Sequence, residues 1–138
     1  SVTFLNRSSK KAENLAFELN SAAGRQFARA LALPDFRRIP EGKRFVTIQA
    51  TSVGLGADAD RAVIEDPEFY KRVGIAVDVI FNPAETKFMK LAKQEGAKTF
   101  NGLKMLLYQG IIAFELWTGK KIDEATADEI YLKLKEQV

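Results

Sequence analysis

The stretch NGLKMLLYQGIIAFELWTG, which runs from Asn101 to Gly119, decides the fold of this chain. Apolar residues recur in it at helical spacing on nearly every side, in two stripes: Leu103, Leu106, Leu107, Gly110, Ile111, Phe114 and Trp117; and Met105, Ile112, Ala113 and Leu116. A helix that is apolar all round is buried on more than one face, so we expect it in a core or between domains. Gln109 stands mid-helix, and a buried amide needs hydrogen-bonding partners. It either satisfies neighbouring backbone groups or faces a polar ligand.

The composition limits the chemistry that is open to the chain. Its 138 residues fit one domain. With no Cys and no His, it lacks disulfides, thiol nucleophiles, a histidine base and the commonest metal ligands. The net charge of +3 is too small and too evenly spread for nucleic acid, and no apolar run reaches the ~20 residues of a membrane span. We therefore expect no metal, nucleic-acid partner or membrane partner, and a cytoplasmic location. The chain starts without Met and within a stretch that reads as a strand, so we expect a fragment.

The first junction between a strand and a helix is basic. Val2–Leu5 reads as a strand, and helical spacing follows from Ala12 to Ala23, with Ser8 or Ser9 as the expected N-cap. Three cations crowd this helix start: Arg7, Lys10 and Lys11. The positive end of the helix dipole makes such a cluster unfavourable unless an anion binds. In a dinucleotide-binding fold, an acidic residue at the end of this strand binds the 2′-hydroxyl of NAD. Basic residues there, with no acidic residue, suit the 2′-phosphate of NADP instead. A solvated basic turn is the alternative, and the residues alone leave both open.

The rest of the chain alternates between strands and helices. Further strands are expected at Arg25–Ala32, Phe45–Ala50, Gly74–Phe81 and Lys98–Asn101, and helices at Asp35–Arg38, after Asp66-Pro67, at Thr86–Glu95 and at Asp123–Gln137. Phe45–Ala50 is mostly apolar, as a buried parallel strand should be. The loop Thr51–Gly56 after it carries hydroxyls and two glycines, which suit either close approach of backbone to a ligand or a tight turn.

Four motifs resemble, in order and over essentially the whole chain, those of the shikimate dehydrogenase family. They are Asn6-Arg7-Ser8 with Lys11, for N-R-T-x-x-K/R; Ile48–Gly54, for I-N-A-T-S-x-G with Gln49 in place of Asn; Asp78–Thr86, for D-x-V-Y-N-P-x-x-T with Phe81 in place of Tyr; and Asn101–Gln109, for N/D-G-L-x-M-L-x-x-Q. The resemblance implies an α/β fold: a Rossmann-like, doubly wound parallel sheet that lacks its first central strand, with C-terminal helices. It implies one NADP-binding domain over residues 1–138, as part of a larger two-domain enzyme.

The resemblance also implies roles for individual residues. The expected NADP contacts are Asn6, Arg7, Ser8, Lys11, Ala50, Thr51, Ser52, Gly102 and Met105. Arg7 and Lys11 would clamp the 2′-phosphate, and Gly102 would approach the nicotinamide by its backbone. Gln109 would hydrogen-bond a hydroxyl of shikimate or quinate, whereas Phe81 keeps stacking surface but loses the tyrosine hydroxyl. The family's glycine-rich turn and its Lys–Asp pair for proton transfer are not among the motifs present. We therefore expect no catalytic residue in this chain.

The function implied by the resemblance is the cofactor half of an NADP-dependent shikimate dehydrogenase. Such an enzyme transfers hydride reversibly between NADP(H) and 3-dehydroshikimate or shikimate in aromatic amino-acid biosynthesis, the chorismate pathway. The alternative is a non-catalytic nucleotide-binding or interaction module that retains the scaffold. In the strand order 3-2-1-4-5-6, the missing first strand would separate Val2–Leu5 from Phe45–Ala50. Three arrangements are then open: the two strands pair directly with each other, an upstream segment lies between them, or a second copy of the chain pairs with the exposed sheet edge to form a homodimer. We expect association at the exposed edge rather than direct pairing of the two strands.

Overall fold

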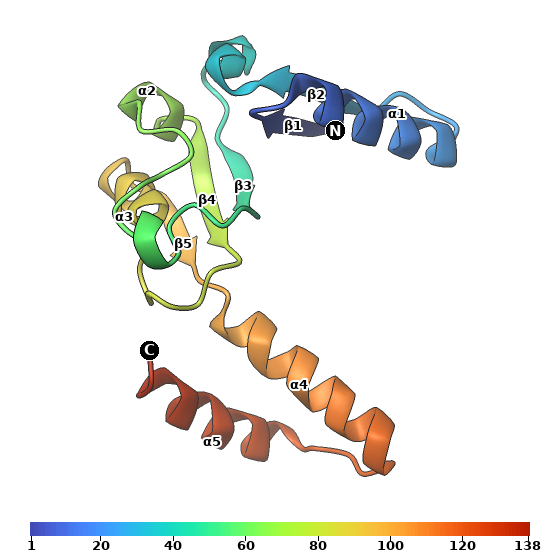
Figure 1. The fold of residues 1–138 in the computed structure, drawn as a ribbon, viewed down its shortest axis with the longest axis vertical. Helices are drawn as coiled ribbons and strands as arrows, with labels where there is room; N and C mark the ends of the chain where they lie inside the picture. The colour runs from blue at the N-terminus through green and yellow to red at the C-terminus, as the bar shows by residue number, and fades with distance from the viewer. The chain divides into compact units, whose positions relative to one another are not determined.

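The computed structural model describes all residues, Ser1–Val138. The chain forms two compact units, Ser1–Gly42 and Lys43–Val138, and each contains its own parallel sheet (Figure 1). None of the helices combines the length and the apolar character that a membrane span requires. That both units belong to one NADP-binding domain stays a prediction.

The first unit is a strand–helix–strand arrangement followed by a short 3-10 helix. Its elements are β1 (Val2–Asn6), α1 (Ser9–Ala23), β2 (Ala28–Ala32) and η1 (Leu33–Arg38). The strands β1 and β2 are parallel, with Val2 opposite Ala28 and Asn6 opposite Ala32. Gly24 ends α1 with a φ of 61°, a left-handed conformation that glycine adopts without steric cost. The strands and helices predicted for this part of the sequence are confirmed.

The buried stripe of α1 is narrow and contains an amide side chain. Its members are Ala12, Ala16 and Asn20, spaced four residues apart, whereas Leu15 and Leu19 are exposed. Asn20 is buried because its amide holds the start of β2. Its Oδ1 accepts the backbone N–H groups of Phe27 and Ala28, each at 2.9 Å, and its Nδ2 donates to the Ala28 carbonyl at 2.8 Å. A two-stranded sheet covers only one narrow side of the helix, which leaves the leucines outside.

The second unit contains a three-stranded parallel sheet. Its elements before the C-terminal helices are β3 (Phe45–Gln49), η2 (Gly56–Asp58), α2 (Pro67–Tyr70), β4 (Val73–Asp78), α3 (Lys87–Gln94) and β5 (Lys98–Phe100). The strand order is β3-β4-β5, so the prediction that these strands stay parallel and intact is confirmed. The core lies between β4, α2 and α3. Tyr70 is buried there, and its hydroxyl donates to the Ile64 carbonyl at 2.5 Å. Burial raises the pKa of the Tyr70 hydroxyl above its usual value.

Only one face of this sheet is covered within the unit. Residues paired in a parallel sheet project to the same face, and the pairs Thr47–Ala76 and Gln49–Asp78 lie on the face packed by α3. On the other face Val46 and Ile48 are 63 % and 64 % exposed. The prediction of a fully buried Phe45–Ala50 strand is therefore wrong, because burial of its second face needs a layer that this unit does not contain.

The strands β1 and β3 do not pair with each other. β1 pairs only with β2, and β3 only with β4, so each has one edge without a strand partner in this chain. Direct closure, one of the three arrangements considered from the sequence, is not formed. Association of two chains at an exposed edge stays a prediction.

The C-terminal part is a pair of packed helices, α4 (Leu103–Thr118) and α5 (Glu124–Lys135) (Figure 1). The connection is fixed by Glu115, whose carboxylate accepts from the Lys121 ammonium at 2.6 Å and from the Ile122 N–H at 2.9 Å. These two bonds lower the pKa of Glu115. In α4 only Leu103 and Leu107 are buried, and Trp117 is 85 % exposed. Burial on more than one face, the first of the two alternatives, is thus not formed within this chain, because α5 covers only part of the circumference of α4; a position between domains stays a prediction.

The entry into α4 requires a glycine. Gly102 donates its N–H to the Ile80 carbonyl at 2.9 Å, and a Cβ at position 102 would lie 2.0 Å from the Val79 carbonyl oxygen. We expect Gly102→Ala to lower the free energy of unfolding by about 1–3 kcal/mol, because rigid backbone of the β4 loop must shift to admit the methyl group. Urea-induced unfolding monitored by circular dichroism measures the change.

The matched control is Gly110→Ala in the interior of α4. A Cβ at this position meets no atom within 4 Å, so helix propensity alone decides the effect. Alanine at such a site raises the stability by about 0.5–1 kcal/mol. Equal effects of the two substitutions would contradict the close packing assigned to Gly102.

Candidate functional site

The loop after β1 presents free polar groups at the start of α1. Asn6, the last residue of β1, accepts the Ser8 N–H with its Oδ1 at 2.9 Å and so turns the backbone into the helix. Ser8 occupies the N-cap position, as predicted, but its hydroxyl makes no capping bond. The helix start therefore keeps backbone N–H donors, and the hydroxyl of Ser8, for another partner.

Positive charge accumulates at this helix start without compensation. Arg7, Lys10 and Lys11 are exposed, the first turn of α1 contains no acidic residue, and none of the three cations forms an ion pair within the chain. The helix dipole adds about half a positive charge at the same end. An anion bound here would relieve the repulsion, and a phosphate fits the available N–H and cationic donors. Four predicted site residues, Asn6 to Ser8 and Lys11, are thus brought together in the first unit.

In the second unit, a buried carboxylate organises the carboxyl ends of β3 and β4. Asp78, the last residue of β4, has no exposed surface. Its Oδ2 accepts the Thr86 hydroxyl at 2.6 Å, and its Oδ1 accepts the Ile80 N–H at 3.0 Å. Thr86 also caps α3, since its Oγ1 accepts the Met89 N–H at 3.4 Å. One carboxylate therefore fixes the end of β4, the loop after it and the start of α3.

Gln49 joins the loop after β3 to this carboxylate. It lies opposite Asp78 in the sheet and is 5 % exposed. Its Nε2 donates to Asp78 Oδ1 at 3.3 Å and to the Val53 carbonyl at 2.9 Å, and its Oε1 accepts the Thr51 N–H. From the sequence, Gln49 was noted only because it replaces the Asn of the family motif, and no role was predicted for it. The available signal was a single amide at the end of an otherwise apolar strand.

The remaining predicted cofactor residues surround these loops. Ala50, Thr51 and Ser52 are exposed, as a ligand-contacting loop requires. Gly102 is buried against the loop after β4, which also carries Phe81, and one turn along α4 Met105 is 57 % exposed. The hydrogen bond from Gly102 to Ile80, beside the bond from Ile80 to Asp78, links the start of α4 to the Gln49 network. A series of hydrogen bonds through Gln49 and Asp78 thus connects Thr51 with Gly102.

Gln109 lies apart from that network. It is exposed, so the expectation of a buried amide is wrong. It borders an apolar groove of about 400 Å³ between α4 and α5, and the other lining residues are Leu106, Leu107, Gly110, Ile111, Phe114, Ile122, Ile130 and Leu134. Its amide makes no hydrogen bond within the chain, which leaves it available to a polar ligand. That Gln109 binds a substrate hydroxyl stays a prediction.

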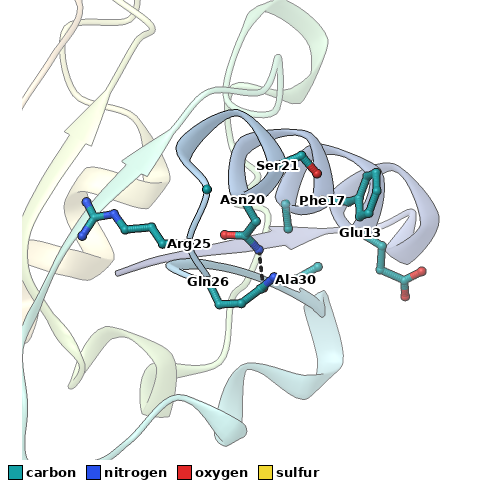
Figure 2. A pocket seen from close by; sticks show the side chains of 9 residues that line it. Glu13, Phe17, Asn20, Ser21, Arg25, Gln26 and Ala30 are labelled. Atoms are coloured by element: carbon teal, nitrogen blue, oxygen red, sulfur yellow. Dashed lines mark hydrogen bonds between the residues drawn. The ribbon is translucent and has the colours of Figure 1, made fainter.

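A second cavity, of about 470 Å³, lies where α1 meets β2 in the first unit (Figure 2). Figure 2 shows Glu13 and Phe17 projecting from α1, and the Asn20 amide turned toward Gln26, to which it donates at 2.9 Å. The buried polar group of this cavity is therefore already satisfied by the chain itself. No residue of the predicted cofactor or substrate site lines it, and it plays no part in the site.

The comparisons with known proteins concern the sequence and the fold of the chain. A sequence profile described as "Shikimate 5'-dehydrogenase C-terminal domain" matches residues 102–128. The shikimate dehydrogenase (NADP(+)) of Clostridium perfringens strain 13 is 41 % identical over 93 residues, which cover 67 % of this chain and 34 % of that protein. A chorismate mutase/shikimate 5-dehydrogenase fusion protein from Clostridium acetobutylicum superposes with a TM-score of 0.78 at 29 % identity, over 99 % of this chain and 44 % of that one. A shikimate dehydrogenase in complex with NADP+ superposes with a TM-score of 0.74 at 31 % identity, over 95 % and 45 %.

Sequence and fold agree on one family. The chain belongs to the shikimate dehydrogenase family. It spans between 34 % and 45 % of the length of the relatives named above. The predicted Rossmann-type fold of this chain is confirmed by the superpositions over nearly its whole length. The profile match begins at Gly102 and includes Met105 and Gln109, three of the predicted site residues.

The buried carboxylate network yields a stability prediction. Asp78→Ala removes the acceptor of the Ile80 N–H, the Thr86 hydroxyl and one proton of the Gln49 amide. Each buried donor left unsatisfied costs roughly 1–3 kcal/mol, so we expect a loss of at least about 2 kcal/mol in the free energy of unfolding. Chemical unfolding followed by circular dichroism measures it.

Asp58→Ala is the matched control, because Asp58 pairs only with the exposed Arg61 at 3.0 Å. Exposed ion pairs contribute about 0–1 kcal/mol. If Asp78→Ala were no more destabilising than Asp58→Ala, the organising role of Asp78 would be refuted.

Proposed function

We propose that this chain is the cofactor-binding part of an NADP-dependent shikimate dehydrogenase, with both units belonging to one cofactor domain. The complete enzyme would transfer hydride reversibly between NADP(H) and 3-dehydroshikimate or shikimate, with quinate as the alternative substrate. The names of the related proteins support NADP as the cofactor. Membership in a family of biosynthetic enzymes supports a cytoplasmic location.

The observation that carries the proposal is the uncompensated basic cluster at the start of α1. Arg7 and Lys11 are exposed and unpaired beside the free hydroxyl of Ser8. NAD offers a 2′-hydroxyl, which an acid recognises, whereas NADP offers a 2′-phosphate with two negative charges. The start of α1 therefore supplies donors for the phosphate, and its first turn contains no carboxylate for the hydroxyl.

The second unit supplies groups suited to the other end of the cofactor. The exposed backbone and hydroxyls of Ala50–Ser52 suit ribose and pyrophosphate. The absence of a side chain lets Gly102 pack against the Val79 carbonyl, and the family resemblance places the backbone at this position beside the nicotinamide. Met105 adds an exposed, flexible apolar surface next to it. On the substrate side, the unpaired amide of Gln109 would orient a ring hydroxyl, and Phe81 would contribute stacking surface.

Arg7→Ala tests the recognition of the 2′-phosphate. A charge-assisted hydrogen bond contributes roughly 1.5–3 kcal/mol, so we expect the substitution to weaken NADP+ binding by about one to two orders of magnitude. Binding of NAD+, which lacks the phosphate, should stay unchanged. Isothermal titration calorimetry of the purified chain with each cofactor measures both affinities.

The matched control is Arg25→Ala, which removes the same charge from the same unit just beyond the C-terminal end of α1 (Figure 2). The guanidinium of Arg25 lies over the Phe27 ring, 5.4 Å from its centre, and has no part in the proposed site. It should leave NADP+ affinity within about twofold of the unsubstituted chain, since a distant exposed charge is largely screened. Equal binding of NADP+ and NAD+ by the unsubstituted chain would refute the assignment.

A second prediction concerns turnover. The motifs present in this chain do not include the Lys–Asp pair that the family resemblance assigns to proton transfer. Because general acid–base assistance contributes about 10²–10⁴ to the rate, we expect the 138-residue chain to show no oxidation of shikimate by NADP+ above background. NADPH absorbance in the presence of both substrates measures it. Turnover by material of verified mass, free of host enzyme, would show that the catalytic groups lie within this chain.

A further inference from the structure

Gln49 occupies an unusual position for an amide side chain. It ends β3 on the covered face of the sheet, directly opposite the fully buried Asp78. The motif that Ile48–Gly54 resembles carries Asn at this point, a side chain shorter by one methylene group. A longer amide in a buried place must find partners further away, because unpaired polar groups there are costly.

The partners of Gln49 lie at both ends of the following loop. Its Oε1 accepts the Thr51 N–H, and its Nε2 donates to the Val53 carbonyl at 2.9 Å. The Val53 N–H in turn donates to the Thr51 hydroxyl at 3.2 Å. The backbone on each side of Ser52 is thereby held by one side chain, while Ala50, Thr51 and Ser52 remain exposed.

The same amide connects this loop to the start of α4. Its Nε2 reaches Asp78 Oδ1 at 3.3 Å, and that oxygen accepts the Ile80 N–H at 3.0 Å. The Ile80 carbonyl then accepts the Gly102 N–H at 2.9 Å. A continuous series of hydrogen bonds therefore runs from Thr51 to Gly102, and Gln49 is the member that spans from one loop to the other.

We propose that Gln49 is a positioning residue for the cofactor. It fixes the backbone of Ala50–Val53 relative to Gly102, and so sets the affinity of the chain for the ribose and nicotinamide end of NADP. This inference rests on the proposed function, in which these two segments contact NADP. The side-chain hydrogen bonds of Gln49 all lie within the second unit, so we expect its effect at that end of the cofactor. Asparagine would reach the Thr51 N–H in a local turn, but not the Val53 carbonyl at the same time.

The test compares two ligands on the 138-residue chain. NADP+ carries both ends of the cofactor, whereas adenosine 2′,5′-bisphosphate carries only the phosphorylated adenosine. Gln49→Met preserves the shape of the side chain and removes its hydrogen bonds. We expect it to weaken NADP+ binding about tenfold, a change of about 1.4 kcal/mol, and to leave bisphosphate binding within about twofold. Gln94→Met, at an exposed site on α3, is the control and should change neither affinity.

A measurement without ligand examines the loop itself. Amide hydrogen exchange at Thr51 should be at least about tenfold faster in Gln49→Met and close to the unsubstituted rate in Gln49→Asn, which keeps the local turn. Gln49→Asn should weaken NADP+ binding by about threefold. If Gln49→Met does not fold, the NADP+ affinity of Gln49→Asn tests the positioning role in its place.

Two results would overturn the inference while leaving the proposed function intact. One is NADP+ affinity of Gln49→Met equal to that of the unsubstituted chain. The other is an equal loss of affinity for both ligands, which would indicate a general structural role. If the unsubstituted chain binds neither ligand, the proposed function fails and the positioning role fails with it.

Discussion

The buried carboxylate of Asp78 is the constraint on which the candidate site depends. A carboxylate with no exposed surface is tolerated only when its oxygens accept enough hydrogen bonds, and here the donors come from Thr86, Ile80 and Gln49. Each donor belongs to a different segment: the start of α3, the loop after β4 and the end of β3. Satisfying one buried group therefore fixes three segments at the carboxyl edge of the sheet, the edge where ligands bind in open α/β folds.

In the proposed function, each of the two units would favour cofactor binding by a different physical effect. In the first unit the decisive feature is charge: exposed Arg7 and Lys11 at the positive end of a helix dipole, with no carboxylate to pair them. In the second unit it is geometry: a tethered loop and a glycine pressed against the Val79 carbonyl. Charge would give the preference for a phosphorylated ribose, and a fixed backbone would hold the groups that contact the remainder of the ligand.

Local signals predicted the elements of this fold well. The helix that runs to Ala23, the short helix after Asp66-Pro67 and the strand β4 all form at or near the positions that the sequence patterns predict. These features depend on neighbours in sequence, and hence can be read without knowledge of the tertiary structure. The position of Ser8 before α1 was predicted for the same reason, although its hydroxyl does not cap the helix.

Predictions of burial failed where they depended on partners. The apolar circumference of α4, the outer face of β3 at Val46 and the amide of Gln109 were all expected to be covered, and all are exposed in this chain. Apolar periodicity indicates that a surface is buried in the functional protein, but it does not identify the segment or partner that buries it. Conversely, Asn20 and Gln49 are buried because their amides satisfy backbone groups, and polarity alone does not reveal this.

The most direct test of the account is a nitrogen–proton correlation spectrum of the chain during titration with NADP+. The account predicts that the shifted amides are those of Asn6–Lys11, Ala50–Val53 and Gly102, and that NAD+ leaves the Arg7 and Lys11 amides unshifted. Shifts confined to other regions, such as the cavity beside Asn20, or no shifts at saturating NADP+, would contradict it.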